Sequence, residues 1–148
     1  MKIRNAAMYD INEITAVESA CFPEAEAATR EEFEKRLAHY ADCFWLMTDD
    51  NGKIISFVDG MATDRRDLTD EMYENAALHD PNGRWQMIFG VNTLPEYRRR
   101  GYAEALLRRV AIDAKNRGRS GLVLTCKERL IHYYAKLGFV NEGLSRST

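Results

Sequence analysis

The segment from residue 85 to residue 126 constrains the fold of this chain most strongly. Residues 85–93, "WQMIFGVNT", form an apolar strand candidate that Pro95 terminates. A turn with three arginines follows, and then a helix whose apolar positions recur in steps of three and one: Ala103, Leu106, Leu107, Val110, Ala111 and Ala114. "NRGRSG" ends that helix with Gly118 as its C-cap, and the apolar run at 121–126 predicts a strand buried on both faces.

The rest of the chain supplies further strands and helices. The expected strands are residues 3–8, 43–48, 53–61 and 139–142. The expected helices follow two capping boxes (Asp10 with Glu13, Thr29 with Glu32), span residues 67–78, and lie in "LIHYYAKLGF". Asp50-Asn51-Gly52 predicts a hairpin turn between two of the strands. This order predicts a single mixed α/β domain over residues 1–148, with helices packed on a central sheet.

The composition is typical of one cytoplasmic globular domain. A chain of 148 residues has the length of one domain. Its net charge of -2 and isoelectric point of about 5.9 argue against non-specific binding of nucleic acid. The N-terminus is too polar for a signal peptide, and no apolar run reaches the roughly 20 residues of a membrane helix. Cys21, Cys43 and Cys126 are widely spaced, which predicts reduced and mostly buried thiols, and the scattered histidines predict no metal site.

The arginine turn predicts a binding site for an anion. Arg98, Arg99 and Arg100 precede Gly101, and the helix begins by Ala103. The first amides of a helix have no partner within it and carry the positive end of its dipole. Glycine lets the backbone approach a ligand, and arginine donates to phosphate oxygens. Because a helix N-terminus favours acidic side chains, a bound anion explains three arginines better than a solvated turn does.

The same residues resemble a known family. Arg98-x-x-Gly101-x-Ala103 is similar to the (Arg/Gln)-x-x-Gly-x-(Gly/Ala) signature of the GCN5-related N-acetyltransferase (GNAT) family. "GVNTLPEYRRRGYAEALL" resembles that family's strand, loop and helix, and "HYYAKLGF" resembles its later Tyr-Tyr-x-x-x-Gly-Phe segment. With the order of elements, the likeness covers nearly the whole chain. Within the family, "ACFPEAEAAT", "LHDPNG" and "LVLTCKERLIHYYAKLGFVNEG" are most similar to bacterial relatives of the arylalkylamine (serotonin-type) N-acetyltransferases.

The resemblance implies acetyl-CoA as the donor, the primary amine of a small molecule as the acceptor, and no metal. It implies that the strand before the turn is splayed at a bulge and that pantetheine pairs with it as an added strand. The Val91 amide would then bind the thioester oxygen, where negative charge develops as the amine attacks, and the Thr93 amide would bind pantetheine. Tyr134 matches the tyrosine that protonates the leaving thiolate, although a packing role on a short helix is the alternative. The implied pyrophosphate-binding residues are Arg98, Arg99, Arg100, Gly101, Tyr102 and Ala103.

The general base and the acceptor pocket depart from the pattern of the animal enzymes in that branch. Those enzymes have two histidines at the positions that Met87 and Phe89 occupy here, and neither residue accepts a proton. We therefore expect the amine to lose its proton through His79, Asp80 or a water chain that ends at a carboxylate. The favoured alternative is that His79 is a loop residue without a role. Phe22 and Phe89 are the expected acceptor-binding residues, with a core position as the alternative for Phe22.

Other functions remain open from the sequence. One is acetylation of a protein N-terminus or lysine, and another is a CoA-binding domain without catalysis. A nucleic-acid-binding module rests only on the arginines at 98–100 and 117–119 and ranks last. A homodimer is compatible with the sequence. Since the family usually adds one more strand after the last one predicted here, we expect the final strand of the sheet to be missing or replaced.

Overall fold

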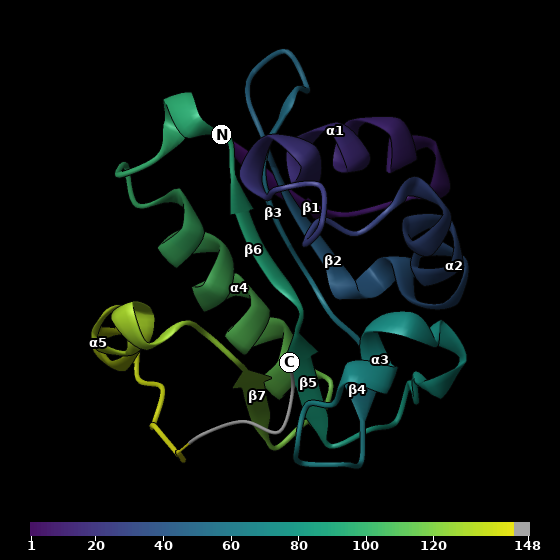
Figure 1. Ribbon diagram of the computed structural model, residues 1–148, viewed down its shortest axis with the longest axis vertical. Coiled ribbons are helices and arrows are strands. Elements are labelled where there is room, and N and C mark those ends of the chain that lie inside the picture. Colours follow the sequence, from purple (N-terminus) through teal and green to yellow (C-terminus); the bar gives the residue numbers. More distant parts are fainter. Residues whose placement is uncertain (144–148) are drawn as a thin grey trace.

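A computed structural model describes residues 1–143 as a central sheet of short strands with helices on both faces (Figure 1). The strands are β1 (Lys2–Asn5), β2 (Phe44–Thr48), β3 (Ile54–Asp59), β4 (Ala62–Thr63), β5 (Trp85–Ile88), β6 (Gly90–Thr93) and β7 (Gly121–Leu124). The α-helices are α1 (Ile11–Cys21), α2 (Arg30–Tyr40), α3 (Asp70–Glu74), α4 (Tyr102–Asn116) and α5 (Ile131–Lys136). The predicted mixed α/β class is confirmed.

Two groups of hydrogen-bonded strands, called ladders below, make up the central sheet. Strands β1, β2, β3 and β6 pair in that order, all antiparallel. Strands β4, β5 and β7 form the second ladder, in which β5 and β7 run parallel. The predicted hairpin between β2 and β3 is confirmed: Asp49 Oδ1 accepts hydrogen bonds from the amides of Asn51 and Lys53, and Gly52 has a φ of +83°.

The two ladders separate at Phe89. Ile88 at the end of β5 lies opposite Leu124 of β7, whereas Gly90 at the start of β6 lies opposite Asp59 of β3. The single strand predicted over 85–93 is therefore two strands, divided at one residue. Beyond this break one edge of β6 pairs with no strand among the described residues (Figure 1). The splay that the family resemblance implied is present.

Helices α1 and α2 cover one face of the sheet, and α4 covers the other (Figure 1). Helices α1 and α4 both contact β3, which is buried along its whole length. Phe33 of α2 packs edge-on against Phe44 and Phe57, with ring centroids 6.1 Å apart in both pairs. Leu106 and Val110 of α4 are buried on the opposite face. In the part of the chain that the structure describes, no helix is long and apolar enough to cross a membrane.

Two predicted helix caps are confirmed. Thr29 Oγ1 accepts a hydrogen bond from the Glu32 amide at 3.1 Å, and Glu32 Oε1 accepts one from the Thr29 amide at 3.2 Å. Gly118 follows α4 with a φ of +81°, and its amide donates to the Lys115 carbonyl at 3.0 Å. Local sequence therefore determines the start of α2 and the end of α4.

The capping box predicted at Asp10 is wrong. The Asp10 carboxylate accepts two hydrogen bonds from the Arg4 guanidinium of β1, at 2.8 and 2.9 Å. Glu13 Oε2 accepts from the Ile54 amide of β3 at 2.7 Å. Both carboxylates thus bind neighbouring strands, because tertiary partners were available that the local pattern does not reveal.

Several predicted boundaries also need correction. The strand predicted over 139–142 is wrong, since residues 139–143 belong to no strand. The prediction that 121–126 is buried on both faces is wrong as well: β7 is half-buried, because it lies at the edge of its ladder in the described chain. The strand predicted over 3–8 ends at Asn5, and the helix predicted over 67–78 is divided into α3 and a 3-10 turn at Ala76–Leu78.

Candidate active site

Two backbone amides of β6 face its unpaired edge. In an antiparallel pair, successive residues alternate between bonding the partner strand and pointing away from it. The Leu94 amide donates to the Ile55 carbonyl at 2.9 Å, so Leu94 faces β3, and so does Asn92 two residues earlier. The amides of Val91 and Thr93 are one residue out of phase and therefore face the open edge. These are the two amides predicted to bind the thioester and pantetheine.

The arginine turn begins where β6 ends. Arg98 Nε donates to the Thr93 carbonyl at 3.0 Å and holds the turn against the strand. Arg99 and Gly101 both have left-handed backbone conformations, with φ values of +64° and +82°. A residue other than glycine in this region costs about 1–2 kcal/mol. Strain of this kind is typical of functional sites, which supports a ligand-binding role for the turn.

The turn has the space and the donors that a phosphate group needs. A Cβ on Gly101 would meet no heavy atom within 4 Å, so the backbone is open to a ligand there. Arg99 and Arg100 are exposed, and the Arg100 guanidinium lies 5.5 Å from the centre of the Tyr97 ring. Helix α4, with 15 residues, directs its first amides towards the same turn. The open edge of β6, the turn and the start of α4 follow one another along the chain.

Comparison with protein families decides what kind of protein this is. The model of the acetyltransferase (GNAT) family matches residues 8–139. The chain belongs to the GNAT family. The GNAT family uses acetyl-CoA, the molecule whose pantetheine and pyrophosphate were predicted to bind the β6 edge and the arginine turn. As a GNAT protein the chain is an acyltransferase enzyme.

Solved structures share this fold over nearly the whole chain. GphF, a GNAT-like decarboxylase in complex with isobutyryl-CoA, is 25% identical with a TM-score of 0.76, over 95% of this chain and 73% of that chain. The ribosomal-protein-S18-alanine N-acetyltransferase from Escherichia coli is 19% identical with a TM-score of 0.71, over 97% and 79% of the two chains. The glucosamine-6-phosphate N-acetyltransferase from Arabidopsis thaliana is 18% identical with a TM-score of 0.71, over 99% and 96%. No curated protein matches the chain. These likenesses support the GNAT family as a whole and do not single out its arylalkylamine branch.

Tyr134, the predicted general acid of this GNAT domain, lies on α5. Its ring makes edge contacts with Tyr133 and Phe139, with centroids 5.1 and 5.8 Å away. Burial, and then the neighbouring Tyr133 and Cys126, raise the pKa of the Tyr134 phenol to about 12. The phenol is therefore protonated at neutral pH and able to donate. Its transfer of a proton to the leaving thiolate stays a prediction.

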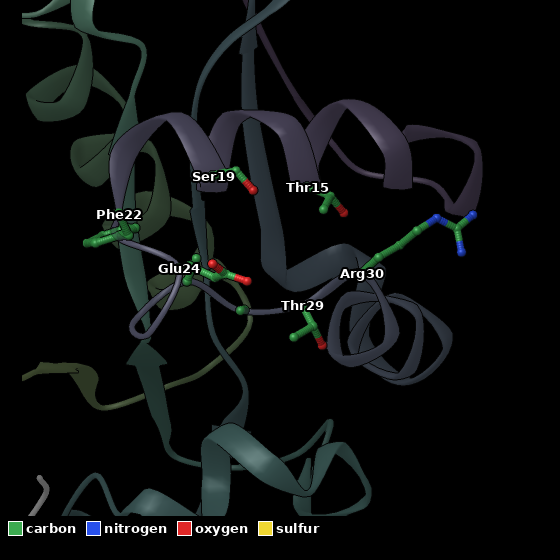
Figure 2. Close-up of a pocket in the computed structure, with 8 residues that line it drawn as sticks. Thr15, Ser19, Phe22, Glu24, Thr29 and Arg30 are labelled. Carbon is green, nitrogen blue, oxygen red and sulfur yellow. The ribbon is translucent and has the colours of Figure 1, made fainter.

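A cavity of about 440 Å³ lies between α1 and the segment that leads to α2 (Figure 2). Its lining residues are Thr15, Ser19, Phe22, Glu24, Ala27, Ala28, Thr29 and Arg30. Phe89 does not line this cavity: its ring packs 4.5 Å from the ring of Tyr73 and 5.1 Å from the Arg36 guanidinium. Phe22 therefore lines this cavity and Phe89 does not, and the acceptor-binding roles of both stay predictions.

His79 and Asp80, two predicted proton acceptors, are engaged in local contacts. His79 Nδ1 accepts a hydrogen bond from the Ala62 amide at 3.0 Å, and its ring packs 4.9 Å from that of Tyr40. Burial lowers the pKa of His79, so the imidazole is neutral and carries its proton on Nε2. Asp80 Oδ1 accepts from the Asn82 amide at 2.9 Å. His79 therefore has no lone pair left for a substrate proton, whereas a role for Asp80 stays a prediction.

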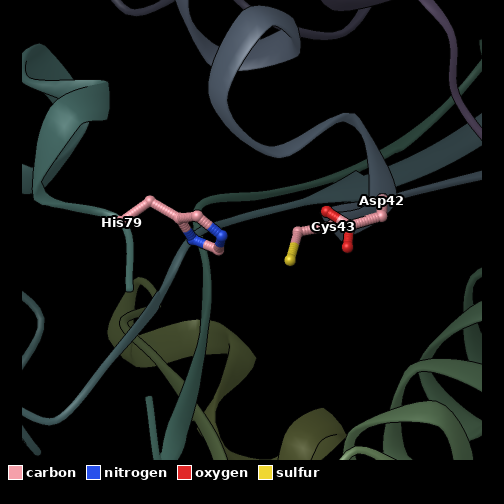
Figure 3. A group of neighbouring side chains, drawn as sticks. All are labelled: Asp42, Cys43 and His79. Carbon is pink, nitrogen blue, oxygen red and sulfur yellow. The ribbon is translucent and has the colours of Figure 1, made fainter. Parts of the chain in front are cut away.

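One group of potential metal ligands occurs in the described chain (Figure 3). Donor atoms of Asp42, Cys43 and His79 lie within 4.8 Å of one another. Burial raises the pKa of the Cys43 thiol to about 12, which disfavours the thiolate that a metal requires. Arg117 Nη1 lies 4.0 Å from Cys43 Sγ, and Arg119 adds a second positive charge. We do not assign a metal to this group, because the nearby cations oppose one.

The second run of arginines has a structural role. Arg119 is buried, and its Nη1 donates to the carbonyls of Pro81 and Gly83 at 3.2 and 2.7 Å. Arg117 Nη1 donates to the Asp42 carbonyl at 3.0 Å. A nucleic-acid interface therefore loses two of the five arginines on which that interpretation depended.

Sequence reasoning missed a buried polar cluster on the α1 side of the bulge. The polar cluster comprises Glu18 of α1, Arg36 of α2, Asp59 of β3 and Asn92 of β6, all buried. Two signals could have found it. Asp59 directly follows the apolar run of β3, and Glu18 shares the buried face of α1 with Ile14. An acidic side chain on an otherwise apolar face has to find a polar partner inside the protein.

We expect the affinity for acetyl-CoA to fall as salt rises. The Debye length shrinks from about 10 Å at 0.1 M to about 3 Å at 1 M, so contacts from exposed arginines are screened. Titration calorimetry over this range, on wild type and Arg99→Gln, should show a shallower salt dependence in the variant. Arg109→Gln is the matched control, because Arg109 lies on α4, outside the turn, and pairs with Asp113 at 3.3 Å. A wild-type affinity that does not change with salt would show that the turn does not bind the phosphates.

Proposed function

We propose that this protein is an acetyl-CoA-dependent N-acetyltransferase that acetylates the primary amine of a small molecule by direct attack on the thioester. The observation that carries the proposal is the continuous path from the open edge of β6, through the left-handed turn at Arg99 and Gly101, to the start of α4. Acetyl-CoA supplies the activated acetyl group when it is bound. Family membership and the GNAT-like structures support this use of the path.

Each part of that path has a separate role in binding acetyl-CoA or in catalysis. The Val91 amide donates to the acetyl oxygen and stabilises the negative charge that develops there. The Thr93 amide orients the pantetheine arm, and residues 98–103 bind the pyrophosphate through backbone amides and guanidinium groups. Tyr134 donates a proton to the departing sulfur.

A small amine is the acceptor that the α1 cavity supports. Its volume of about 440 Å³ lies within the range of small-molecule sites. Phe22 supplies an apolar contact, as the likeness to arylalkylamine acetyltransferases suggests, and Glu24 adds a carboxylate to the same lining. Three unpaired cysteines, of which only Cys43 is fully buried, are consistent with a reducing cytoplasm.

Thiol release from acetyl-CoA with a panel of amines tests this function. The panel should contain arylalkylamines, amino sugars, and peptides with free N-termini or lysines, with mass spectrometry of each product. Small amines reacting faster than peptides would support the proposal, and the reverse order would favour a protein substrate. Because GphF is a GNAT-like decarboxylase, malonyl-CoA should be included, and loss of carbon dioxide without amine acetylation would overturn acetyl transfer as the function.

We expect His79→Ala to change the turnover number by less than about threefold. Nδ1 of His79 already accepts from the Ala62 amide, so the side chain has no free site for a substrate proton. The measurement is kcat with a good amine between about pH 6 and 9, a range chosen to include the usual pKa of histidine. An inflection in wild type that disappears in His79→Ala would identify His79 as the base and contradict this expectation.

A further inference from the structure

The polar cluster lies beside the proposed reaction centre and has no part in the function described so far. Its four side chains, Glu18, Arg36, Asp59 and Asn92, are each less than a tenth exposed. A Cβ on Gly90 would lie 3.0 Å from Asn92 Nδ2, 3.4 Å from Asp59 Oδ1 and 3.9 Å from Glu18 Oε1. Three polar atoms thus converge on the face of Gly90 where a side chain would be too close to Asn92, one residue before the amide assigned to the thioester oxygen.

Arg36 and Asp59 balance each other's charge. Arg36 Nη1 lies 3.0 Å from Asp59 Oδ2, and Arg36 Nη2 donates to the Tyr73 carbonyl at 3.1 Å. The guanidinium also lies 5.1 Å from the centre of the Phe89 ring. Because one guanidinium matches one carboxylate, the second carboxylate of the cluster, that of Glu18, is the one available to change its protonation state.

Glu18 is fixed by one oxygen and turns the other towards Gly90. Its Oε2 accepts a hydrogen bond from the Ala28 amide at 2.9 Å. The fully buried Asn92 side chain lies close enough to Glu18 to favour its charged form, yet among residues 1–143 neither of its polar atoms makes a hydrogen bond of good geometry. Buried polar groups are usually satisfied by protein or by ordered water. An unsatisfied amide next to a carboxylate therefore indicates a place for a water molecule or a polar group of the substrate.

We propose that Glu18 accepts, through a water molecule at Gly90, the proton that the amine loses as it attacks the acetyl group. This inference rests on the proposed N-acetyltransferase function. The amine nitrogen bonds to the acetyl carbon while the carbon–sulfur bond breaks. The proton from nitrogen goes to Glu18, the sulfur takes a proton from Tyr134, and exchange with solvent restores both side chains. Since α1 and α4 cover opposite faces of the sheet, the proton leaves on the face opposite the arginine turn.

The electrostatics of Glu18 agree with this role. Burial raises the pKa of Glu18 most, and the charge of Asp59 raises it further, to about 7. The Ala28 amide, Arg36 and Asn92 act in the opposite direction, because they favour the charged form. Cys21, at the end of α1, is the other titratable group that faces it. A base has to be ionised to accept a proton, so kcat should be low below pH 7 and should rise to a plateau above it.

The test compares Glu18→Gln with Glu13→Gln. Glutamine keeps an oxygen for the Ala28 amide but accepts no proton. Glu13 is the matched control, since it lies on the same helix and accepts from a backbone amide at 2.7 Å, that of Ile54. Glu18→Gln should lose roughly 10²-fold in kcat at pH 8 and lose the inflection near pH 7, with unchanged affinity for acetyl-CoA. Glu13→Gln should behave like wild type in all three respects.

A second measurement decides the matter if Glu18→Gln does not fold. Carbon-13 NMR of the glutamate carboxyl groups should show one group that titrates near pH 7 in the wild-type protein. The same group should be present in folded Glu13→Gln. The inference is overturned if Glu18→Gln keeps the wild-type profile, if it loses acetyl-CoA binding while folded, or if no glutamate titrates near pH 7. If wild type and Glu13→Gln release no thiol with any amine, the proposed function itself has failed, which is a different result.

Discussion

Gly101→Val should abolish the binding of acetyl-CoA while leaving the domain folded. Gly101 has a φ of +82° directly before α4, and its Cβ position is free of protein atoms within 4 Å. A valine there would project into the space assigned to the pyrophosphate and would disfavour the left-handed turn. Hydrogen bonds to charged groups contribute about 1.5–3 kcal/mol each, so losing two of them weakens binding by roughly 10²-fold or more.

Gly118→Val provides the matched control for this result. Gly118 lies at the other end of α4, with a φ of +81° and no heavy atom within 4 Å of its Cβ position. Both variants should lose similar stability, about 1–2 kcal/mol for a left-handed residue that is not glycine. Titration calorimetry with acetyl-CoA should then separate them, with binding lost only in Gly101→Val. Equal affinity in the two folded variants would mean that the turn before α4 is not the CoA cradle.

The turn at Gly101 was predictable because its signal is local. Three arginines before a glycine, between an apolar run and an amphipathic pattern, need no distant partner to be interpreted. The same holds for the Thr29 cap and for Gly118, whose hydrogen bonds join residues at most a few positions apart. Backbone conformation and helix ends depend on short stretches of chain, so sequence patterns describe them well.

The polar cluster could not be assembled from the sequence because its members meet only in three dimensions. Glu18 and Asp59 are 41 positions apart and come together because α1 packs on β3 and β6. Asp10 and Glu13 were misassigned for the same reason, since strands β1 and β3 supply their donors. The order of strands, and hence which carboxylate faces Gly90, depends on long-range pairing that no local pattern records.

Tyr134→Phe should lower turnover by roughly 10²-fold to 10⁴-fold, the usual contribution of general acid catalysis. The phenol of Tyr134 has a pKa raised to about 12, chiefly by burial, so it is protonated at every pH at which the amine reacts readily. Phenylalanine keeps the edge contacts with Tyr133 and Phe139 and removes only the hydroxyl. The loss should therefore appear in kcat, with nearly unchanged affinity for acetyl-CoA.

Tyr133→Phe separates a catalytic hydroxyl from a general effect on α5. Tyr133 is the adjacent residue, is more exposed, and packs against the Tyr134 ring itself. Its hydroxyl should be dispensable, because consecutive side chains of a helix point in different directions and the proposed role belongs to Tyr134. A donor to a departing thiolate matters most for a poor leaving group, so an activated aryl thioester of acetate should largely restore the rate of Tyr134→Phe. If turnover at saturating substrates is unchanged in Tyr134→Phe, or if Tyr133→Phe loses as much, the proton reaches the sulfur from another source.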